Sequence, residues 1–490
     1  MGFLSKLPHA ALDTVIVDHH DQQMQPISKQ TLMQAVAELI IDFKALDMSA
    51  VAFVMDNTPA WLIVDFALIE LQQVSIPLPT FFSPQQLTNS VNKSGVSHFI
   101  SDTPCELDGL ECIATLSVLT RYPLYIYKVS ASSPTTFFTD TQKVTFTSGS
   151  TGEPKGVCLS LQSQLQVATS LHKKIAIKQP KHLCLLPLPV LLENIAGVFA
   201  PLLAAGEVHV MTLAELGFSG AKLNDASQLI NAIDRVQPNT LILVPELLTC
   251  LVWFAKQGWT VPKSLKFIAV GGAVVSSELI TVARSLGLPV YQGYGLSEAS
   301  SVVSLNTPND DDIECAGRVL NHLQSKQVDG QLFIKGPLFL GYLGQQPHDQ
   351  TSWYATGDLV DQQQGRLTIK GRLKNQIITS FGRNISAEWP ESLLLSNSEV
   401  QQAVVFGEGK AHLVALIYAS VNMTDEVLAE HCRGINAQLP EYAQIKTFHR
   451  LAEPLTAERG LLTSNNRPKR QAIANYYHAQ LTALYSEAIL

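Results

Sequence analysis

The sequence lacks the features that mark several large classes of protein. Of its 490 residues only 16% are charged, and 34 Lys and Arg stand against 42 Asp and Glu, giving a net charge of −8. We therefore expect no nucleic-acid partner, since the one basic cluster, residues 467–470, is too short to form a binding surface. The seven cysteines are scattered and never form a Cys-x-x-Cys pair. This excludes a zinc site of that type and predicts reduced thiols in a cytoplasmic protein.

Long apolar runs are also missing. The most membrane-like segment, residues 183–205, contains three prolines together with Glu193 and Asn194. A membrane-spanning helix needs roughly 20 mostly apolar residues without such breaks. We expect this segment to be buried core and predict no transmembrane helix, and the first residues do not resemble a secretory signal. Loose peripheral contact with a membrane stays open.

What is present indicates a globular α/β protein. Hydrophobic residues make up 46% of the chain, and its length exceeds what one core supports, so two or more domains are expected. Short β-branched runs alternate with helical patterns, which is typical of α/β layers. The clearest predicted strands are residues 51–55, 144–147, 240–244, 267–270 and 289–292, and the clearest helix is residues 59–72.

The pattern changes towards the C-terminus. After residue 306, residues 331–335 and 365–370 predict antiparallel strands of a small β region. Beyond about residue 375 the strands and helices return, with strands at 403–406 and 412–418 and a helix at 425–438. We predict a large N-terminal domain, residues 1–373, of two αβ layers plus the small β region. A smaller, mobile α+β domain, residues 374–490, would follow it.

The most informative segment is residues 147–156, Thr-Ser-Gly-Ser-Thr-Gly-Glu-Pro-Lys-Gly. Glycines allow the backbone to approach a ligand closely, and successive N–H groups can form an anion-binding concavity. The segment follows a predicted strand, where α/β proteins bind ligands. Its spelling is not that of a Walker A motif, and its Pro-Lys ending disfavours a simple flexible loop. The candidate phosphate-binding residues are Thr147, Ser148, Gly149, Ser150, Thr151, Gly152 and Lys155.

Four further islands narrow the ligand. Residues 271–273 follow a strand and would let a flat ligand lie on the backbone. Residues 291–298 offer an aromatic face, a hydroxyl and a carboxylate suited to Mg²⁺. A carboxylate in a tight turn at 356–358 suits a ribose diol, and a guanidinium at 372 adds a fork of donors for oxygens. The candidate residues in these islands are Gly271, Gly272, Ala273, Tyr294, Gly295, Ser297, Glu298, Asp358 and Arg372.

Together and in this order, the five islands resemble the AMP-forming adenylate-forming enzymes. These comprise acyl- and aryl-CoA synthetases, adenylation domains of peptide synthetases, and luciferases. The ending at residues 460–463 is closer in spelling to long-chain fatty acyl-CoA synthetases. The resemblance implies that ATP and a carboxylic acid give acyl-AMP and pyrophosphate. The small domain then rotates, and a thiol attacks the acyl-AMP to give a thioester. The implied cofactors are ATP, Mg²⁺ and either CoA or the phosphopantetheine of a separate carrier protein.

The resemblance also implies a role for each phosphate-site residue. Ser148, Thr151 and Lys155 would hold the β- and γ-phosphates. Ser297 would contact the α-phosphate, and Glu298 would bind the Mg²⁺ ion. Thr151, Lys155, Ser297 and Glu298 therefore belong to the expected catalytic set.

The nucleoside would be held by the remaining islands. Gly272 and Ala273 with Tyr294 would flank the adenine. Asp358 and Arg372 would grip the ribose, and Arg372 joins the expected catalytic set.

The chain departs from the family in two places. The family carries a C-terminal lysine that bridges the carboxylate and the α-phosphate, and here Arg467 stands in that position with Lys469 two residues later. Either Arg467 acts in its place, or Lys469 reaches in, or adenylation is slow. Val190 stands where many relatives have histidine or an aromatic residue, which favours an open apolar acyl channel or is simply core packing. Lys374 falls at the family's hinge position.

Three functions follow from the sequence. The first is a fatty acyl-CoA synthetase, and the second is an enzyme that loads a fatty, aryl or polyketide-starter acid onto a separate carrier protein. The third, of another class, is a catalytically impaired adenylate-binding protein. His322, His348 and His449 have no place in any of them and are expected to be ordinary surface or loop residues.

Overall fold

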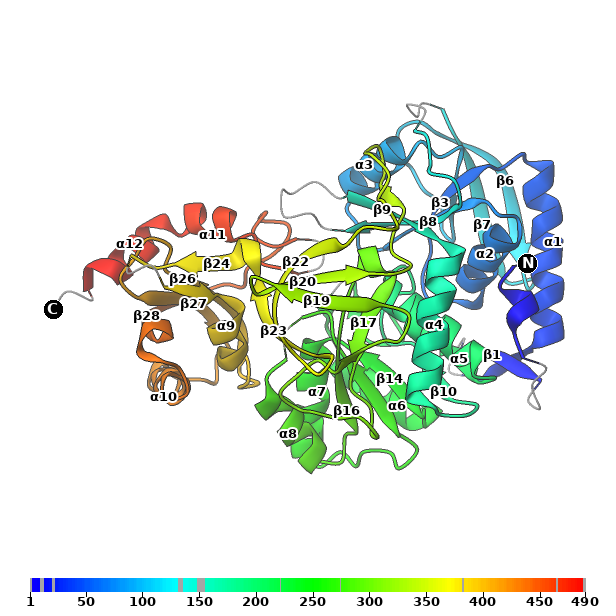
Figure 1. The fold of residues 1–490 in the computed structure, drawn as a ribbon. Coiled ribbons are helices and arrows are strands. Elements are labelled where there is room, and N and C mark those ends of the chain that lie inside the picture. The colour runs from blue at the N-terminus through cyan, green and yellow to red at the C-terminus, as the bar shows by residue number, and fades with distance from the viewer. Residues whose placement is uncertain are drawn as a thin grey trace.

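The computed structural model describes residues 2–8, 13–19, 23–130, 135–147, 155–220, 222–273, 275–380, 383–463 and 466–487. The chain forms a large N-terminal part and a smaller C-terminal part, the latter coloured from yellow to red in Figure 1. Both parts mix helices and strands, which confirms the predicted α/β class. The division at residue 373 stays a prediction.

The first sheet carries the strands that flank the glycine-rich segment. Its centre is parallel, with β3 pairing to β4 and β5, and β4 to β8, whereas β8 and β9 are antiparallel. In spatial order its strands are β21 (Gly341–Tyr342), β9 (Lys155–Ser160), β8 (Thr141–Thr147), β4 (Val74–Leu78), β3 (Ala50–Val54), β5 (His98–Ser101), β7 (Tyr122–Val129) and β6 (Leu110–Val118).

The second sheet has a mainly parallel section and an antiparallel section. Its strands in spatial order are β19 (Gln324–Val328), β20 (Gln331–Lys335), β22 (Tyr354–Gln363), β23 (Arg366–Arg372), β18 (Arg318–Val319), β17 (Ser301–Leu305), β16 (Val290–Leu296), β15 (Phe267–Val270), β14 (Thr240–Leu243), β10 (Lys181–Leu183), β11 (Glu207–Val210), β1 (Thr14–Asp18) and β2 (Gln25–Ser28). Strand β16 is the junction, because its first half pairs in parallel with β15 and its second half antiparallel with β17. The predicted small β region therefore continues the second αβ sheet.

Helices of the large part cover and separate these sheets. They are α1 (Lys29–Ala45), α2 (Pro59–Glu70), α3 (Pro84–Ser94), α4 (Leu161–Ile175), α5 (Ala200–Leu203), α6 (Ala226–Val236), α7 (Pro245–Lys256) and α8 (Ser277–Ser285), with short turns η1 (Leu4–Lys6), η3 (Glu193–Phe199, a π-helix), η4 (Ser297–Ala299) and η5 (Leu373–Asn375). Helix α2 begins with Pro59 at its first position, where the missing N–H costs nothing. It is buried on all sides from Pro59 to Ile69 and packs against β4 of the first sheet and β1 of the second. An all-round apolar helix of this kind belongs in a core.

None of the described helices combines the length and apolar character needed to cross a membrane. The segment at residues 183–205 instead runs from the end of β10 through η3 and α5, and most of its side chains are buried. It is core, as predicted.

The C-terminal part contains a two-stranded sheet, β24–β25, and a three-stranded sheet, β26–β27–β28, which is packed on both faces. It comprises β24 (Gln376–Ile378), β25 (Asn384–Ser386), α9 (Glu388–Leu394), β26 (Val400–Phe406), β27 (Leu413–Ala419), α10 (Asp425–Asn436), η6 (Glu441–Ala443), β28 (Ile445–Arg450), α11 (Arg470–Tyr476) and α12 (His478–Glu487). Alternate residues of β26 face opposite ways: Ala403 and Val405 join the core that includes residues of α9 and α10, whereas Val404 joins the core that includes residues of α11 and α12. This alternation is the period of two expected for a strand buried on both sides.

A buried lysine ties the first sheet to η3. Lys143, in the middle of β8 and almost fully buried, places its Nζ 2.8 Å from Asp65 Oδ2 of α2 and 2.7 Å from Asn194 Oδ1 of η3. Ser75 donates to the other oxygen of Asp65 at 2.9 Å. Burial lowers the pKa of Lys143, and the Asp65 carboxylate opposes that shift. The ammonium group thus has partners at the cost of its hydration.

The neighbouring residue of η3 makes the matching connection to the second sheet. Glu193 Oε1 lies 2.8 Å from His182 Nε2, and His182 Nδ1 lies 2.9 Å from Thr240 Oγ1. The backbone N–H of Leu186 donates to Glu193 Oε2 at 2.9 Å. A Cβ added to Gly197 would come within 2.0 Å of Glu193 Oε1, so this crowded turn requires glycine. Two consecutive residues of η3 therefore tie together both sheets.

We predict that Lys143→Met will lower the free energy of unfolding by about 3 to 5 kcal/mol, because Asp65 is left buried without its charge partner. Urea unfolding followed by tryptophan fluorescence measures this directly, since Lys143 Nζ lies 5.9 Å from the Trp61 ring centre. The double variant Lys143→Met/Asp65→Asn should recover at least half of the loss. A double variant as unstable as the single one would contradict the assignment of the loss to the unpaired carboxylate.

Candidate functional site

The glycine-rich segment is held at both ends by paired strands. Strands β8 and β9 pair up to Thr147 and Lys155, and the Thr147 hydroxyl donates to the Lys155 carbonyl at 3.4 Å. The predicted residues Ser148, Gly149, Ser150, Thr151 and Gly152 lie outside the described residues.

The island at residues 271–273 lies next to the one at 291–298, because β15 and the first half of β16 are parallel neighbours and the end of β15 lies opposite Gln292. A Cβ on Gly271 would stand 3.2 Å from the Gly293 carbonyl oxygen, so the two backbones run close. Gly272 has a φ of +87°, which favours glycine, and both Gly272 and Ala273 are exposed. The end of β15 and the adjoining middle of β16 thus form one open stretch of backbone, here called the backbone shelf.

A buried carboxylate stands beside this shelf. Asp358 on β22 is paired in register with Arg372 on β23, and its Oδ1 lies 2.8 Å from Arg372 Nε. The Tyr294 hydroxyl donates to Asp358 Oδ2 at 2.5 Å. Burial raises the pKa of Asp358, against the opposing effects of Arg372 and Tyr294. A buried carboxylate is stabilised by hydrogen-bond donors, and the two hydroxyl groups of a ligand diol are donors of this kind.

The predicted metal ligand belongs to a second cluster. Glu298, in η4, accepts a hydrogen bond from the Tyr342 hydroxyl at 2.7 Å through its Oε1. Among the described residues, its Oε2 has no hydrogen-bond partner. An anchored carboxylate with one oxygen available fits a hard divalent cation such as Mg²⁺. Ser297 precedes Glu298 and is half-buried. Gly295 is required nearby, because a Cβ there would lie 1.8 Å from the Ser301 carbonyl oxygen.

The same tyrosine reaches the end of the glycine-rich segment. Lys155 Nζ lies 5.2 Å from the centre of the Tyr342 ring, within the range of a cation–π contact. The Tyr342 and Tyr354 hydroxyls are 3.1 Å apart, and burial raises the pKa of Tyr354 to about 12. Neither tyrosine was predicted from the sequence. The available signal was the Gly-Tyr pair at 341–342, just after an apolar run.

One cationic side chain of the C-terminal part contacts the large part. Arg467 Nη2 donates to the Gly272 carbonyl at 3.0 Å. Lys469 is half-buried at the start of α11, and among the described residues its side chain has no polar partner. Within the described part of the chain, Arg467 is therefore the one of the two candidate cations that makes a hydrogen bond to the backbone shelf.

His322 and His348 lie in a turn and a loop, within the prediction of surface or loop residues, whereas His449 lies on a strand. The His348 ring stacks on Phe339 with 5.1 Å between centroids and meets Tyr354 edge-on at 5.6 Å, so it packs against the Tyr342–Tyr354 cluster. His322 is half-buried, and both of its ring nitrogens are shielded from solvent. His449 is half-buried on β28.

The cluster of His182, Cys184 and Glu193 could be mistaken for a metal site. The atoms that could bind an ion lie within 4.8 Å of one another and the three residues are buried. However, His182 and Glu193 are already hydrogen-bonded at 2.8 Å, and their other polar atoms bond Thr240 and Leu186. Burial also raises the pKa of Cys184 well above its ordinary value, which disfavours the thiolate that a metal needs. We assign it as a structural network.

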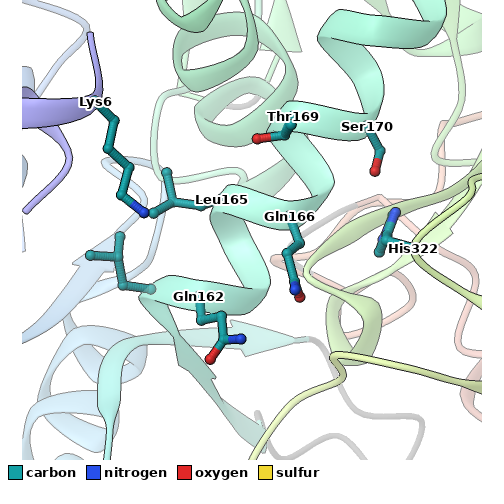
Figure 2. Close-up of a pocket in the computed structure, with 8 residues that line it drawn as sticks. Lys6, Gln162, Leu165, Gln166, Thr169, Ser170 and His322 are labelled. Atoms are coloured by element: carbon teal, nitrogen blue, oxygen red, sulfur yellow. The ribbon is translucent and has the colours of Figure 1, made fainter.

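A hollow of about 480 Å³ lies along α4, away from these clusters. Figure 2 shows residues of one face of α4 with His322 facing them and Lys6 on the other side. Its lining contains none of the predicted site residues.

Comparison with known proteins agrees with this geometry. The profile of the AMP-binding enzyme family matches residues 30–343, and that of the AMP-binding enzyme C-terminal domain matches residues 374–489. The chain belongs to this family, the AMP-forming acid–CoA ligases. Its relatives include the long-chain-fatty-acid–CoA ligase FadD15 of Mycobacterium bovis, 25% identical over 87% of this chain and 86% of the relative.

Solved structures share the fold across the whole chain. The anthranilate CoA ligase AuaEII, in complex with anthranoyl-AMP, has a TM-score of 0.77 at 15% identity and covers 100% of this chain and 98% of its own. O-succinylbenzoate coenzyme A synthetase (MenE) from Bacillus subtilis, in complex with AMP, has a TM-score of 0.75 at 21% identity, covering 96% of this chain and 97% of its own. The latter protein has also been solved with ATP and a magnesium ion.

The buried ring of His322 predicts acid sensitivity. Burial lowers its pKa from 6.5 to about 4, so the unfolded chain takes up a proton first as the pH falls between these values, and stability is lost there. We expect His322 to account for about 2 kcal/mol of that loss, reduced from the full linkage value by its partial exposure. Unfolding of wild type and His322→Asn at pH 7.5 and pH 4.5 measures it. The two proteins should lose stability by different amounts, and equal losses would contradict the prediction.

Proposed function

We propose that this protein activates a fatty acid with ATP to give acyl-AMP and pyrophosphate, and then transfers the acyl group to CoA. The observation that carries the proposal is the convergence of Asp358, Arg372 and Tyr294 beside the exposed Gly272 shelf, with Arg467 reaching it from the C-terminal part. Fatty acids are favoured because the long-chain-fatty-acid–CoA ligase spans 87% of the chain. Aryl-acid ligases among the structural relatives make an aryl acid the competing substrate.

In the proposed adenylation, a carboxylate oxygen of the acid bonds to the α-phosphorus while the bond to pyrophosphate breaks. Lys155 and the segment from Thr147 would hold the β- and γ-phosphates, and Ser297 the α-phosphate. Glu298 would hold the Mg²⁺ ion, which offsets phosphate charge when bound. The barrier falls mainly through alignment and charge neutralisation.

The nucleoside would lie on the shelf. Gly272 and Ala273 would face the adenine with Tyr294, while Asp358 and Arg372 would take the ribose hydroxyls. We propose Arg467 for the role of the family's C-terminal lysine, because Arg467 and not Lys469 bonds to the shelf. Arginine keeps the charge but presents a planar fork, so its hold on the α-phosphate and carboxylate differs from that of lysine.

The second half-reaction needs the C-terminal part to move. We propose that residues 374–490 form this mobile domain with Lys374 as its hinge. Lys374 lies in the short turn η5 and is exposed, which suits a residue that must change backbone conformation. The CoA thiolate would then attack the acyl carbon, and AMP would leave.

The test is ATP-dependent pyrophosphate release over a panel of fatty, aryl and short-chain acids, each with CoA, with a carrier protein and with neither, alongside a titration with AMP. We expect the highest kcat/KM with fatty acids and acyl-CoA as the product. A preference for aryl acids would overturn the substrate class. Product only on a carrier protein would overturn CoA as acceptor, and AMP binding without turnover on any acid would identify an impaired adenylate-binding protein.

Arg467→Ala and Lys469→Ala distinguish the two C-terminal cations. We predict that Arg467→Ala lowers pyrophosphate exchange by about 100-fold, the usual effect of removing one donor that stabilises developing charge. Lys469→Ala should remain within about threefold of wild type and serves as the matched control. Loss in Lys469→Ala alone would assign the role to Lys469. If neither variant loses activity, the C-terminal assignment is wrong.

A further inference from the structure

Tyr342 lies in the first sheet, although in the sequence it falls between two strands of the second sheet. It lies on the two-residue strand β21, which pairs with β9 directly after the glycine-rich segment. The following N–H, of Leu343, donates to the Gly156 carbonyl at 2.8 Å. Gly341 has a φ of +147°, and a Cβ there would come within 2.8 Å of the Phe138 ring. The backbone around Tyr342 is therefore closely fixed against β9.

Its side chain contacts both charged groups of the expected phosphate site at once. The hydroxyl donates to Glu298 Oε1 at 2.7 Å, and the ring face lies 5.2 Å from Lys155 Nζ. Phe339 packs against the ring edge at 5.0 Å, and the Tyr354 hydroxyl lies 3.1 Å from that of Tyr342. An ionised carboxylate can only accept, so the phenol is the donor in this contact.

Glu298 and Lys155 carry opposite charges, and an ion pair between them would compete with the binding of a ligand by either group. Such a pair would turn the carboxylate away from a cation and the ammonium away from phosphate. The tyrosine satisfies each group separately: the hydroxyl takes one carboxylate oxygen and the π face takes the ammonium. Within the described part of the chain, the second oxygen of Glu298 has no hydrogen-bond partner.

We propose that Tyr342 is a positioning residue that orients Glu298 towards Mg²⁺ and Lys155 towards the ATP phosphates while keeping the two apart. This inference rests on the proposed function for the identity of the ligands. The hydroxyl and the ring have separable roles. The hydroxyl acts on the metal through Glu298, and the ring acts on the phosphates through Lys155.

The experiment is calorimetric titration with ATP, without acid so that no turnover occurs, in the presence and absence of Mg²⁺. The measured quantity is the enhancement of ATP affinity by Mg²⁺. We expect Tyr342→Phe to reduce this enhancement about fivefold to tenfold, the loss of one hydrogen bond to a charged group, with little change in metal-free ATP binding. Tyr342→Leu should in addition weaken metal-free ATP binding, because Lys155 loses its ring.

Two controls separate positioning from packing. Tyr125→Phe removes the hydroxyl of a half-buried tyrosine on β7 and should leave both titrations unchanged. In a Glu298→Gln background, Tyr342→Phe should change the Mg²⁺ enhancement by less than about twofold, because its effect passes through that carboxylate. An unchanged enhancement in folded Tyr342→Phe, or the same loss in both backgrounds, would overturn the proposal. Binding is read without turnover, so a failure of the proposed reaction on every acid would leave this result independent.

Discussion

The buried ammonium of Lys143 is the contact on which the geometry of the whole large part depends. It joins β8, the strand that leads to the glycine-rich segment, to α2 and to η3, and η3 in turn bonds the second sheet through Glu193. The strands that flank the glycine-rich segment belong to the first sheet, whereas the backbone shelf at Gly272, proposed to hold the nucleoside, belongs to the second. Hydrophobic packing between two sheets allows sliding, but paired buried polar groups have one low-energy register. The polar connection therefore fixes the distance between the two halves of the site.

Positive charge is in excess where the two parts of the chain meet. Partial loss of hydration and the proximity of Arg372 and Arg467 lower the pKa of Lys374, and partial loss of hydration and Arg372 lower that of Arg467. Asp358 and Glu388 oppose these shifts only in part. An anionic nucleotide would relieve the repulsion, so binding and closure of the two parts would reinforce each other. Arg467, whose guanidinium bonds to the Gly272 carbonyl, belongs to this group of cations.

The sequence predicted the parts of the site that follow from local rules. The glycines that follow β15 and those within β16 lie side by side because these strands are parallel neighbours up to Val270 and Gln292. The bond between Tyr294 and Asp358 could not be predicted, since it depends on β22 returning beside β23 in a continuous sheet. Tyr342 was missed because a two-residue strand carries no periodic signal, and Lys143 because one charged residue in a strand is normally exposed. The choice between Arg467 and Lys469 depends on which side chain reaches the large part, which spacing alone does not reveal.

The short strand β21 has a consequence for how the protein comes to be folded during synthesis. It covers the edge of β9, yet it lies about 180 residues further along the chain, between elements of the other sheet. Until that segment leaves the ribosome, β9 is an open edge beside the glycine-rich segment, a ready template for wrong pairing. The N-terminal sheet is therefore not a self-sufficient folding unit. The edge of β9 beside the glycine-rich segment is covered only after residues 341–342 have been synthesised.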